Sequence, residues 1–187
     1  EAKQAEKRTQ FSLHNARADY RMENADGKHW LVVHEHPLLL AEHLPIVGEH
    51  NVANALAAIA LCEAVGVKAR SLRDGLLNFV GLAHRCVRVR VRQDVAYYND
   101  SKATNVGAAL AAIAGLGPLL NGKLVLILGG DAKGQDLSPL TAALAKHARA
   151  VVLIGRDANL ARAVIPNGVV IEDADSIEAA VTQCADL

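Results

Sequence analysis

The sequence predicts an α/β protein of two domains, residues 1–82 and 83–187, the second with a Rossmann-like fold and a mainly parallel sheet. In the second half of the chain, short apolar runs alternate with helical segments, which is typical of βαβ units. In the first half, several apolar runs are followed by a pair of helical segments. The pattern changes abruptly after Gly81, where we place the domain boundary.

The first domain is predicted to combine antiparallel strands with two helices. Its short apolar runs are at residues 11–14, 30–34 and 38–41. Turn signals at Asp26-Gly27 and at Pro37 separate these runs. Two stretches rich in alanine and leucine follow, at residues 50–65 and 69–79, and both are predicted to be helices.

The second domain is predicted to place its ligands at one edge of its sheet. Its strands are expected at residues 95–99, 123–128, 150–154 and 169–171, each followed by a helical segment. Parallel strands joined in this way share one carboxyl edge, where α/β proteins bind ligands. An earlier stretch, residues 87–92, alternates valine with arginine and is interpreted as a half-buried strand with a solvated arginine face.

Composition excludes several functional classes. The chain has 51% hydrophobic residues, and its 20 basic residues balance 20 acidic ones, so no net charge favours nucleic acid or an anionic membrane. We expect no nucleic-acid partner and no membrane insertion, because no apolar run approaches the roughly 20 residues of a membrane helix. Three scattered cysteines suit reduced thiols in a cytoplasmic protein. The eight histidines show no metal-binding spacing, so no protein-built metal site is assigned.

The loop at residues 99–105, NDSKATN, is the first candidate site. It joins a predicted strand to a predicted helix, and a helix start offers free N–H groups and a positive dipole end to phosphate or carboxylate. Lys102 adds a mobile charge, and Asp100 can accept hydrogen bonds from ribose hydroxyls or hold a metal. The alternative is ordinary capping, with Thr104 as the N-cap.

A second loop, residues 129–134 with the sequence GGDAKG, follows the apolar strand of residues 124–128. Paired glycines allow a close approach of the backbone to a ligand. Lys133 is expected near the same crevice as Lys102, because neighbouring parallel strands end on one side of the sheet. The loop matches neither a Walker A pattern nor GxGxxG, so the alternative is a glycine-rich turn with a solvated lysine.

Asn51 and Asn54 lie one turn apart on the first predicted helix. Their amides can recognise an adenine edge, because each offers a donor and an acceptor. The alternative is that Asn51 only caps the helix.

Arg85 lies at the domain boundary, where a guanidinium can clamp a phosphate, although a lone arginine is usually solvated.

Taken together, these motifs resemble the Mur ligase family over essentially the whole chain. Residues 48–55, GEHNVANA, are similar to the family's HNxxN helix, and residues 81–85, GLAHR, are similar to its boundary GLxHR. Residues 99–105 resemble the NDSKATN stretch of the D-glutamate-adding branch. Other branches and the related folylpolyglutamate synthetases share the first two motifs but not the third.

The resemblance implies a three-domain cytoplasmic enzyme, expected to be a monomer, that uses ATP and Mg²⁺ to phosphorylate a carboxylate of UDP-N-acetylmuramoyl-L-alanine. The amine of D-glutamate then attacks the acyl phosphate. Residues implied to contact ATP are Asn51, Asn54, Arg85 and Asp100. Residues implied to receive D-glutamate and the reacting phosphate are Lys102, Thr104 and Lys133, and the catalytic assignments are Lys102 and Arg85.

The resemblance also sets limits. Ala132 stands where the family usually has glycine, which can alter the turn that carries Lys133. Residues 1–82 correspond to the C-terminal part of the central ATP-binding domain, so the P-loop and the main Mg²⁺ ligands are expected outside these 187 residues. We therefore expect no catalysis by this chain alone. The alternatives are another Mur or folylpolyglutamate-type ligase, or a non-catalytic nucleotide-binding module.

Overall fold

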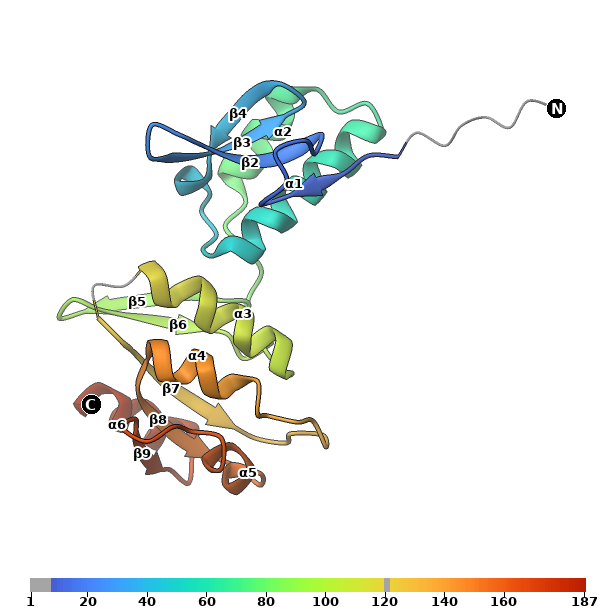
Figure 1. Cartoon of the computed structure of the whole chain (residues 1–187). Helices are drawn as coiled ribbons and strands as arrows, with labels where there is room; N and C mark the ends of the chain where they lie inside the picture. The colour runs from blue at the N-terminus through green and yellow to red at the C-terminus, as the bar shows by residue number, and fades with distance from the viewer. Residues whose placement is uncertain (1–7, 120–121) are drawn as a thin grey trace. The chain divides into compact units, whose positions relative to one another are not determined.

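The computed structural model describes residues 8–119 and 122–187. The chain divides into two compact units, Glu1–Ala83 and His84–Leu187, each with its own hydrophobic core (Figure 1). Each unit is therefore described by itself.

The first unit contains a four-stranded sheet in the order β1-β2-β3-β4. Its strands are β1 (Phe11–Ser12), β2 (Tyr20–Ala25), β3 (Lys28–Val33) and β4 (His36–Leu40). The predicted turn at Asp26 and Gly27 joins β2 to β3, and both residues have the positive φ, 53° and 72°, that a two-residue hairpin requires. Strands β2, β3 and β4 pair antiparallel, as predicted for the runs that form β3 and β4, whereas β2 was not predicted as a strand.

Two predictions for this sheet are wrong. Strand β1 pairs parallel to β2, not antiparallel. Pro37 lies inside β4 instead of marking a turn, and β4 is an edge strand, where proline leaves no ladder hydrogen bond missing inside the sheet.

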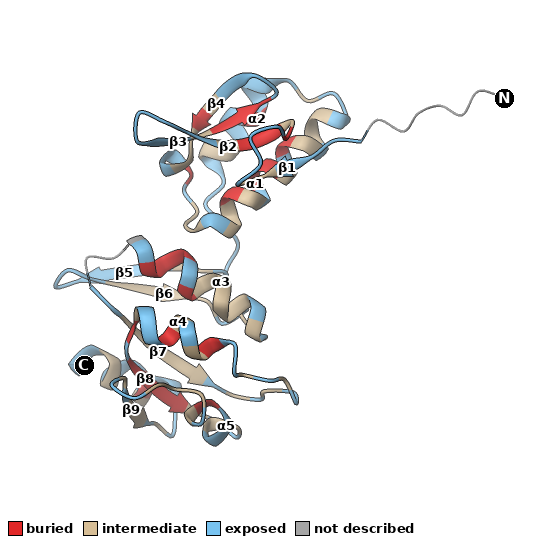
Figure 2. Ribbon diagram, viewed as in Figure 1, coloured by how far each residue is buried: buried red, intermediate tan, exposed pale blue. Residues whose placement is uncertain are grey.

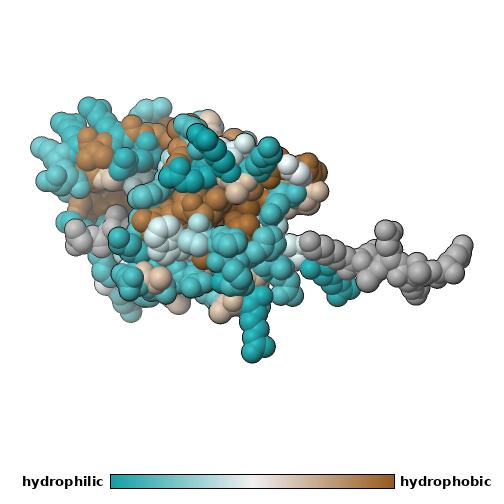
Figure 3. All heavy atoms as spheres, turned by 90° about the horizontal axis from the view of Figure 1, so that it is seen from above, coloured by the Kyte–Doolittle hydropathy of each residue, from teal (hydrophilic) through white to brown (hydrophobic). Residues whose placement is uncertain are grey.

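Two helices pack against this sheet, α1 (Glu49–Ala64) and α2 (Ala69–Asn78), after the short 3₁₀ helix η1 (Ala41–His43). Val52, Ala55, Leu56 and Ile59 form the buried face of α1, because they recur at helical spacing. Gly66 follows the C-cap of α1, Val65, and its φ of 86° allows the amide of Val67 to reach the carbonyl of Cys62 at 3.1 Å. Figure 3 shows apolar surface among hydrophilic surface on the face seen from above.

The second unit confirms the α/β class, because its main sheet is parallel. Strands β7 (Leu124–Gly129), β8 (Ala148–Ile154) and β9 (Val170–Asp173) pair in that order, and both pairings are parallel. Strand β8 is central, and Ala150, Val151, Val152 and Leu153 are all buried (Figure 2). A continuous apolar run is expected for a strand covered on both faces.

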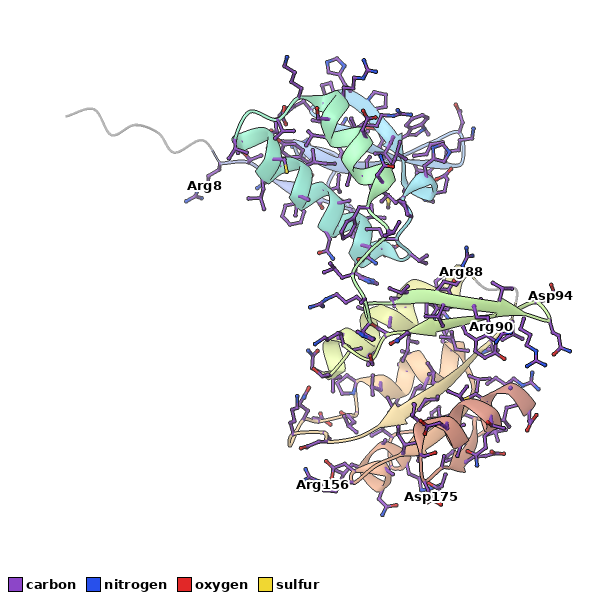
Figure 4. All side chains as sticks on the ribbon, turned by 180° about the vertical axis from the view of Figure 1, so that it is seen from behind. Arg8, Arg88, Arg90, Asp94, Arg156 and Asp175 are labelled. Carbon is purple, nitrogen blue, oxygen red and sulfur yellow. The ribbon has the colours of Figure 1, made fainter. Side chains whose placement is uncertain are left out.

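Four helices and a two-stranded ribbon accompany this sheet. The helices are α3 (Val106–Leu116), α4 (Leu140–His147), α5 (Ala158–Arg162) and α6 (Ile177–Asp186), and the short 3₁₀ helix η2 (Gly117–Leu119) follows α3. Helices α4 and α6 lie on opposite faces of the sheet, since α4 is in front in Figure 1 and α6 is in front in the reverse view of Figure 4. Residues from α3, α4, α5, β7 and β8 share one core.

The ribbon differs from two predictions. Strand β6 (Val95–Asn99) pairs antiparallel with β5 (Val87–Arg92), so among the described strands it does not belong to the parallel sheet. Strand β5 is also not half-buried. Val89 and Val91 are 60% and 57% exposed, while Arg88 and Arg90 extend from the same strand (Figure 4).

Candidate functional site

The loop of residues 99–105, the Asn99 loop, is tied to the segment that carries Arg85. The Oδ1 atom of Asp100 accepts a hydrogen bond from the amide of Cys86 at 2.9 Å. The amide of Lys102 donates to the carbonyl of His84 at 3.1 Å, and the Asn99 amide nitrogen lies 3.1 Å from His84 Nδ1. Because contacts on both sides of Arg85 hold the same loop, the backbone of Arg85 is fixed relative to Asp100.

Helix α3 begins directly after this loop, and its N-cap is Asn105. The Oδ1 atom of Asn105 accepts from the amide of Ala108 at 2.8 Å. The capping alternative for Thr104 is therefore wrong, because the side chain that caps α3 is that of Asn105. The amide of Val106 donates to Oε1 of Gln135 at 3.1 Å. Two of the N–H groups predicted to receive an anion are thus already bonded to the protein's own side chains.

The loop of residues 129–134, the Lys133 loop, lies against the end of β8. A Cβ atom at Gly129 would lie 1.9 Å from the carbonyl oxygen of Ile154, so only glycine fits there. Gly129, Gly130 and Gly134 have positive φ, and so does Lys133, at 52°. Ala132 is not among the residues with positive φ, so alanine is accommodated at this position without left-handed strain.

A local hydrogen bond supports the unusual backbone at Lys133. The amide of Lys133 donates to Oδ1 of Asp131 at 2.8 Å, which closes a turn of the kind that Asp side chains form. This backbone bond is the main cause that lowers the pKa of Asp131, and the charge of Arg156 lowers it further. The Nη2 atom of Arg156 lies 2.8 Å from Oδ1 of Asp131.

The Asn99 loop and the Lys133 loop line one cavity of about 550 Å³ in the second unit. Predicted site residues on its wall are Asp100, Thr104 and Lys133. Gln135 and Asp157 also line it, although the sequence interpretation did not select either residue. Lys102 and Arg85 are exposed and are not among the lining residues.

A third loop, residues 155–157, is the main feature that sequence reasoning missed. We call it the Asp157 loop. It follows β8 as the Lys133 loop follows β7, so its place at a carboxyl strand end was the signal that could have found it. The Oδ2 atom of Asp157 accepts from the amide of Ala132 at 2.8 Å.

Asn51 and Asn54 belong to the first unit, on the first two turns of α1. The N-cap of this helix is Gly48, so the alternative in which Asn51 only caps the helix is wrong. The Asn51 amide nitrogen donates to the carbonyl of Val47 at 2.8 Å, and that of Asn54 lies 3.4 Å from Asn51 Oδ1. The amide of Asn54 is exposed, and the Nδ1 atom of His50 is buried with no hydrogen-bond partner in the described part of the chain.

Cys62, Cys86 and Cys184 are free thiols. Within residues 8–119 and 122–187, no group of three or more His, Cys, Asp and Glu side chains is arranged to hold a metal ion. In the same residues, no helix combines the length and the apolar character that crossing a membrane requires.

Comparison with known proteins relates this chain to the Mur ligases. The family described as Mur ligase, glutamate ligase domain, matches residues 84–187. The UDP-N-acetylmuramoylalanine–D-glutamate ligase of Pseudomonas aeruginosa is 51% identical over 162 residues, which cover 87% of this chain and 36% of the relative. The enzyme of the same name from Nitrosococcus oceani is 46% identical over 165 residues, covering 88% of this chain and 36% of the relative.

The chain belongs to the Mur ligase family. It spans a little over a third of the length of these two relatives, 36% in each case.

Solved structures show the same fold at much lower identity. MurF from Acinetobacter baumannii has a TM-score of 0.72 at 19% identity and covers 94% of this chain and 39% of its own. Folylpolyglutamate synthase from Mycobacterium tuberculosis, complexed with ADP and AMPPCP, has a TM-score of 0.68 at 19% identity, covering 91% of this chain and 41% of its own. At this identity, the likeness concerns the fold alone.

Proposed function

We propose that this chain is part of a ligase that adds D-glutamate to UDP-N-acetylmuramoyl-L-alanine at the expense of ATP. Residues 1–82 would form the C-terminal part of its central ATP-binding domain, and residues 83–187 would form its C-terminal domain. Support comes from two relatives of that name, which are 51% and 46% identical to this chain over most of its length. Because the relatives are much longer, we expect the activity only in the full-length protein.

The reaction we propose has two steps. The substrate carboxylate attacks the γ-phosphorus of ATP, the bond to the β-γ bridging oxygen breaks, and ADP leaves an acyl phosphate behind. The unprotonated amine of D-glutamate then attacks the acyl carbon, phosphate leaves with the bonding electrons, and the amide forms after loss of a proton. Both steps concentrate negative charge, which cations placed in advance can stabilise.

The observation that carries the proposal is the shared wall of the cavity, which brings Asp100, Thr104 and Lys133 together. A hydroxyl and an ammonium suit the carboxylates of an amino acid and a phosphoryl group, and a carboxylate suits the hydroxyls of a ribose. We assign Thr104 and Lys133 to D-glutamate and the reacting phosphate, and Asp100 to the ribose of ATP.

The remaining assignments extend this proposal. Asn51 and Asn54 would recognise the adenine, and Arg85 would reach the ATP phosphates. Lys102 would supply charge to the reacting phosphate from the exposed side of the Asn99 loop. The described residues provide no group of side chains that could hold a metal ion, so we assign the Mg²⁺ ligands to other parts of the protein. A cytoplasmic monomer without a nucleic-acid partner is also part of the proposal.

The test is phosphate release by the full-length protein. We expect release only when ATP, Mg²⁺, UDP-N-acetylmuramoyl-L-alanine and D-glutamate are all present. Equal turnover with L-alanine or meso-diaminopimelate in place of D-glutamate would contradict this branch of the family and favour another Mur ligase. Nucleotide binding without any release would favour a non-catalytic module.

The site assignments are tested by comparing two cationic residues in the full-length protein. Lys102→Ala should lower kcat/KM by about a hundredfold, since a cation at the reacting phosphate is worth several kcal/mol. Arg90→Ala should change it less than about twofold, because Arg90 is exposed on β5 and none of the cavity-lining residues belongs to that strand. Equal losses would indicate a diffuse electrostatic effect instead.

A further inference from the structure

The Asp157 loop holds the Lys133 loop through three polar contacts. The Oδ2 atom of Asp157 accepts from the amide of Ala132 at 2.8 Å. The backbone amide of Asp157 donates to the carbonyl of Gly130 at 3.1 Å. Arg156, labelled in Figure 4, adds the 2.8 Å contact to Asp131. This loop therefore holds each of the three residues before Lys133, namely Gly130, Asp131 and Ala132.

The two loops also approach each other closely enough to act as one piece. A Cβ atom at Gly155 would lie 2.9 Å from the Cα atom of Gly130, so the backbones are packed without an intervening side chain. The amide of Gly130 donates to the carbonyl of Ile154 at 2.9 Å. Displacement of the Asp157 loop would therefore displace the backbone that leads to Lys133.

Lys133 needs such support, because its own backbone conformation is unfavourable. A non-glycine residue at a φ of 52° lies in the left-handed region, which costs about 1–2 kcal/mol. Without external contacts, the chain gains free energy by relaxing to negative φ, and the ammonium group then points elsewhere. The bond from Asp157 to Ala132 constrains the residue next to the strained one.

We propose that Asp157 is a positioning residue for Lys133: its side chain holds the amide of Ala132 and so fixes the direction of the Lys133 ammonium in the cavity. The inference rests on the proposed function, in which Lys133 receives D-glutamate. Arg156 contributes less, because its side chain is 72% exposed and exposed ion pairs contribute little. The Asp157 side chain is only 21% exposed, so its hydrogen bond competes less with water.

The first experiment measures D-glutamate kinetics of the full-length ligase with two variants at this position. Asp157→Ala removes the acceptor, and we expect kcat/KM for D-glutamate to fall by about tenfold to a hundredfold, since a misplacement of about 1 Å has that effect. Asp157→Asn keeps an oxygen for the amide of Ala132 and should stay within about fivefold of the parent protein. A purely structural role would lower the amount of folded enzyme and leave KM unchanged.

Arg162→Ala is the matched control. It removes another ion pair of the second unit, between Arg162 and Asp173, and neither residue lines the cavity. We expect KM for D-glutamate to stay at the parent value. A fall in kcat/KM equal to that of Asp157→Ala would overturn the proposal, because loss of any charge pair would then suffice.

A second measurement does not depend on activity. In the full-length protein, hydrogen–deuterium exchange of peptides covering residues 129–135 should accelerate about fivefold in Asp157→Ala, as expected for loss of one hydrogen bond of about 1 kcal/mol. Arg162→Ala should leave it unchanged. If the parent protein ligates D-glutamate but Asp157→Ala has normal KM and exchange, the positioning role is wrong. If the parent protein does not ligate but the exchange change occurs, the proposed function fails and the loop contact stands.

Discussion

At the scale of single residues, Lys133 combines a strained backbone with a side chain that lines the cavity. Its φ of 52° lies in a region that glycine adopts without penalty, whereas any other L-residue is disfavoured there. The charge, not the backbone, must therefore explain why a lysine occupies this position if the proposed function holds. The cost of the conformation and the benefit of the ammonium can be separated by two substitutions.

We predict that Lys133→Gly is more stable to urea than Lys133→Ala by about 1 kcal/mol, because only glycine removes the left-handed strain. Both variants lack the ammonium, so in the full-length ligase both should lose D-glutamate turnover by about a hundredfold. Equal stability of the two variants would contradict the strained conformation. Retained turnover in either would contradict the assignment of Lys133.

Cys86 and Asp100 permit a test of the Asn99 loop without any substrate. Burial raises the pKa of the Cys86 thiol to about 11, and the nearby charge of Asp100 adds to the effect. The folded state thus binds the thiol proton more tightly than the unfolded state does. The resulting stability is present below the unfolded pKa of about 8.5 and is lost as the pH rises through about 11.

We predict slow alkylation of Cys86 at pH 8 in a chain carrying Cys62→Ser and Cys184→Ser, since only roughly one thiol in a thousand is ionised there. Asp100→Asn retains an oxygen for the amide of Cys86 but removes the charge, so alkylation should accelerate. The measurement is the iodoacetamide rate between pH 7 and pH 10. An alkylation rate of Cys86 that is the same with Asp and with Asn at position 100 would show that the thiol and the Asp100 carboxylate are not neighbours.

At the scale of elements, helix α3 depends on two residues outside it for its first amides. Asn105 caps the amide of Ala108, and Gln135 accepts from the amide of Val106. Gln135 follows the Lys133 loop, so the start of α3 and the Lys133 loop are joined through this bond. Thr104 stands next to the cap and does not supply it.

We predict that Asn105→Ala destabilises the second unit by about 1 kcal/mol, the usual cost of a lost N-cap. Asn105→Asp retains an acceptor oxygen beside the positive helix end and should restore the loss. Thr104→Ala should change the free energy of unfolding by less than about 0.5 kcal/mol. Urea unfolding followed by circular dichroism measures all three. A larger loss at Thr104 than at Asn105 would reverse the assignment of the cap.

Apolar runs predicted the buried elements well and the exposed ones poorly. The run that forms β7 and the buried strand β8 was located within two residues, because strands covered on both faces are continuously apolar. Strand β2 was missed because Arg21, Glu23 and Asn24 interrupt its apolar pattern. The pairing of β6 with β5 was missed because a strand's own residues do not specify its neighbour.

The cavity-lining residues were predictable where they carry charged or hydroxyl groups in a loop after a strand, and not where their side chains hold backbone. Asp100, Thr104 and Lys133 were found because charged and hydroxyl groups after a strand indicate a binding loop. Asp157 and Gln135 were not found, since each acts on an amide of another segment. Such contacts link residues 25 and 29 positions apart, so the position of Asp157 after β8 could be anticipated from the sequence, but its backbone partner could not.

At the scale of the whole molecule, each unit has a hydrophobic core of its own. The first is built around Leu31, Leu56 and Ile59, and the second around Leu144 and Leu153, all of them almost fully buried. Each core draws its residues from one unit only. We therefore expect the two units of the 187-residue chain to unfold in separable steps.

Two glycine substitutions test this expectation, with the sole tryptophan, Trp30 on β3, as the reporter of the first unit. Gly129→Ala forces a Cβ atom against Ile154 and should lower the stability of the second unit by about 3 kcal/mol or more. The far-UV circular dichroism transition should then split, while the midpoint of Trp30 fluorescence stays where it was. The control is Gly75→Ala, which meets nothing within 4 Å in helix α2 and should raise the Trp30 midpoint by stabilising the first unit by about 0.5–1 kcal/mol. A Trp30 midpoint that falls in Gly129→Ala together with the circular dichroism signal would show that the two cores unfold as one.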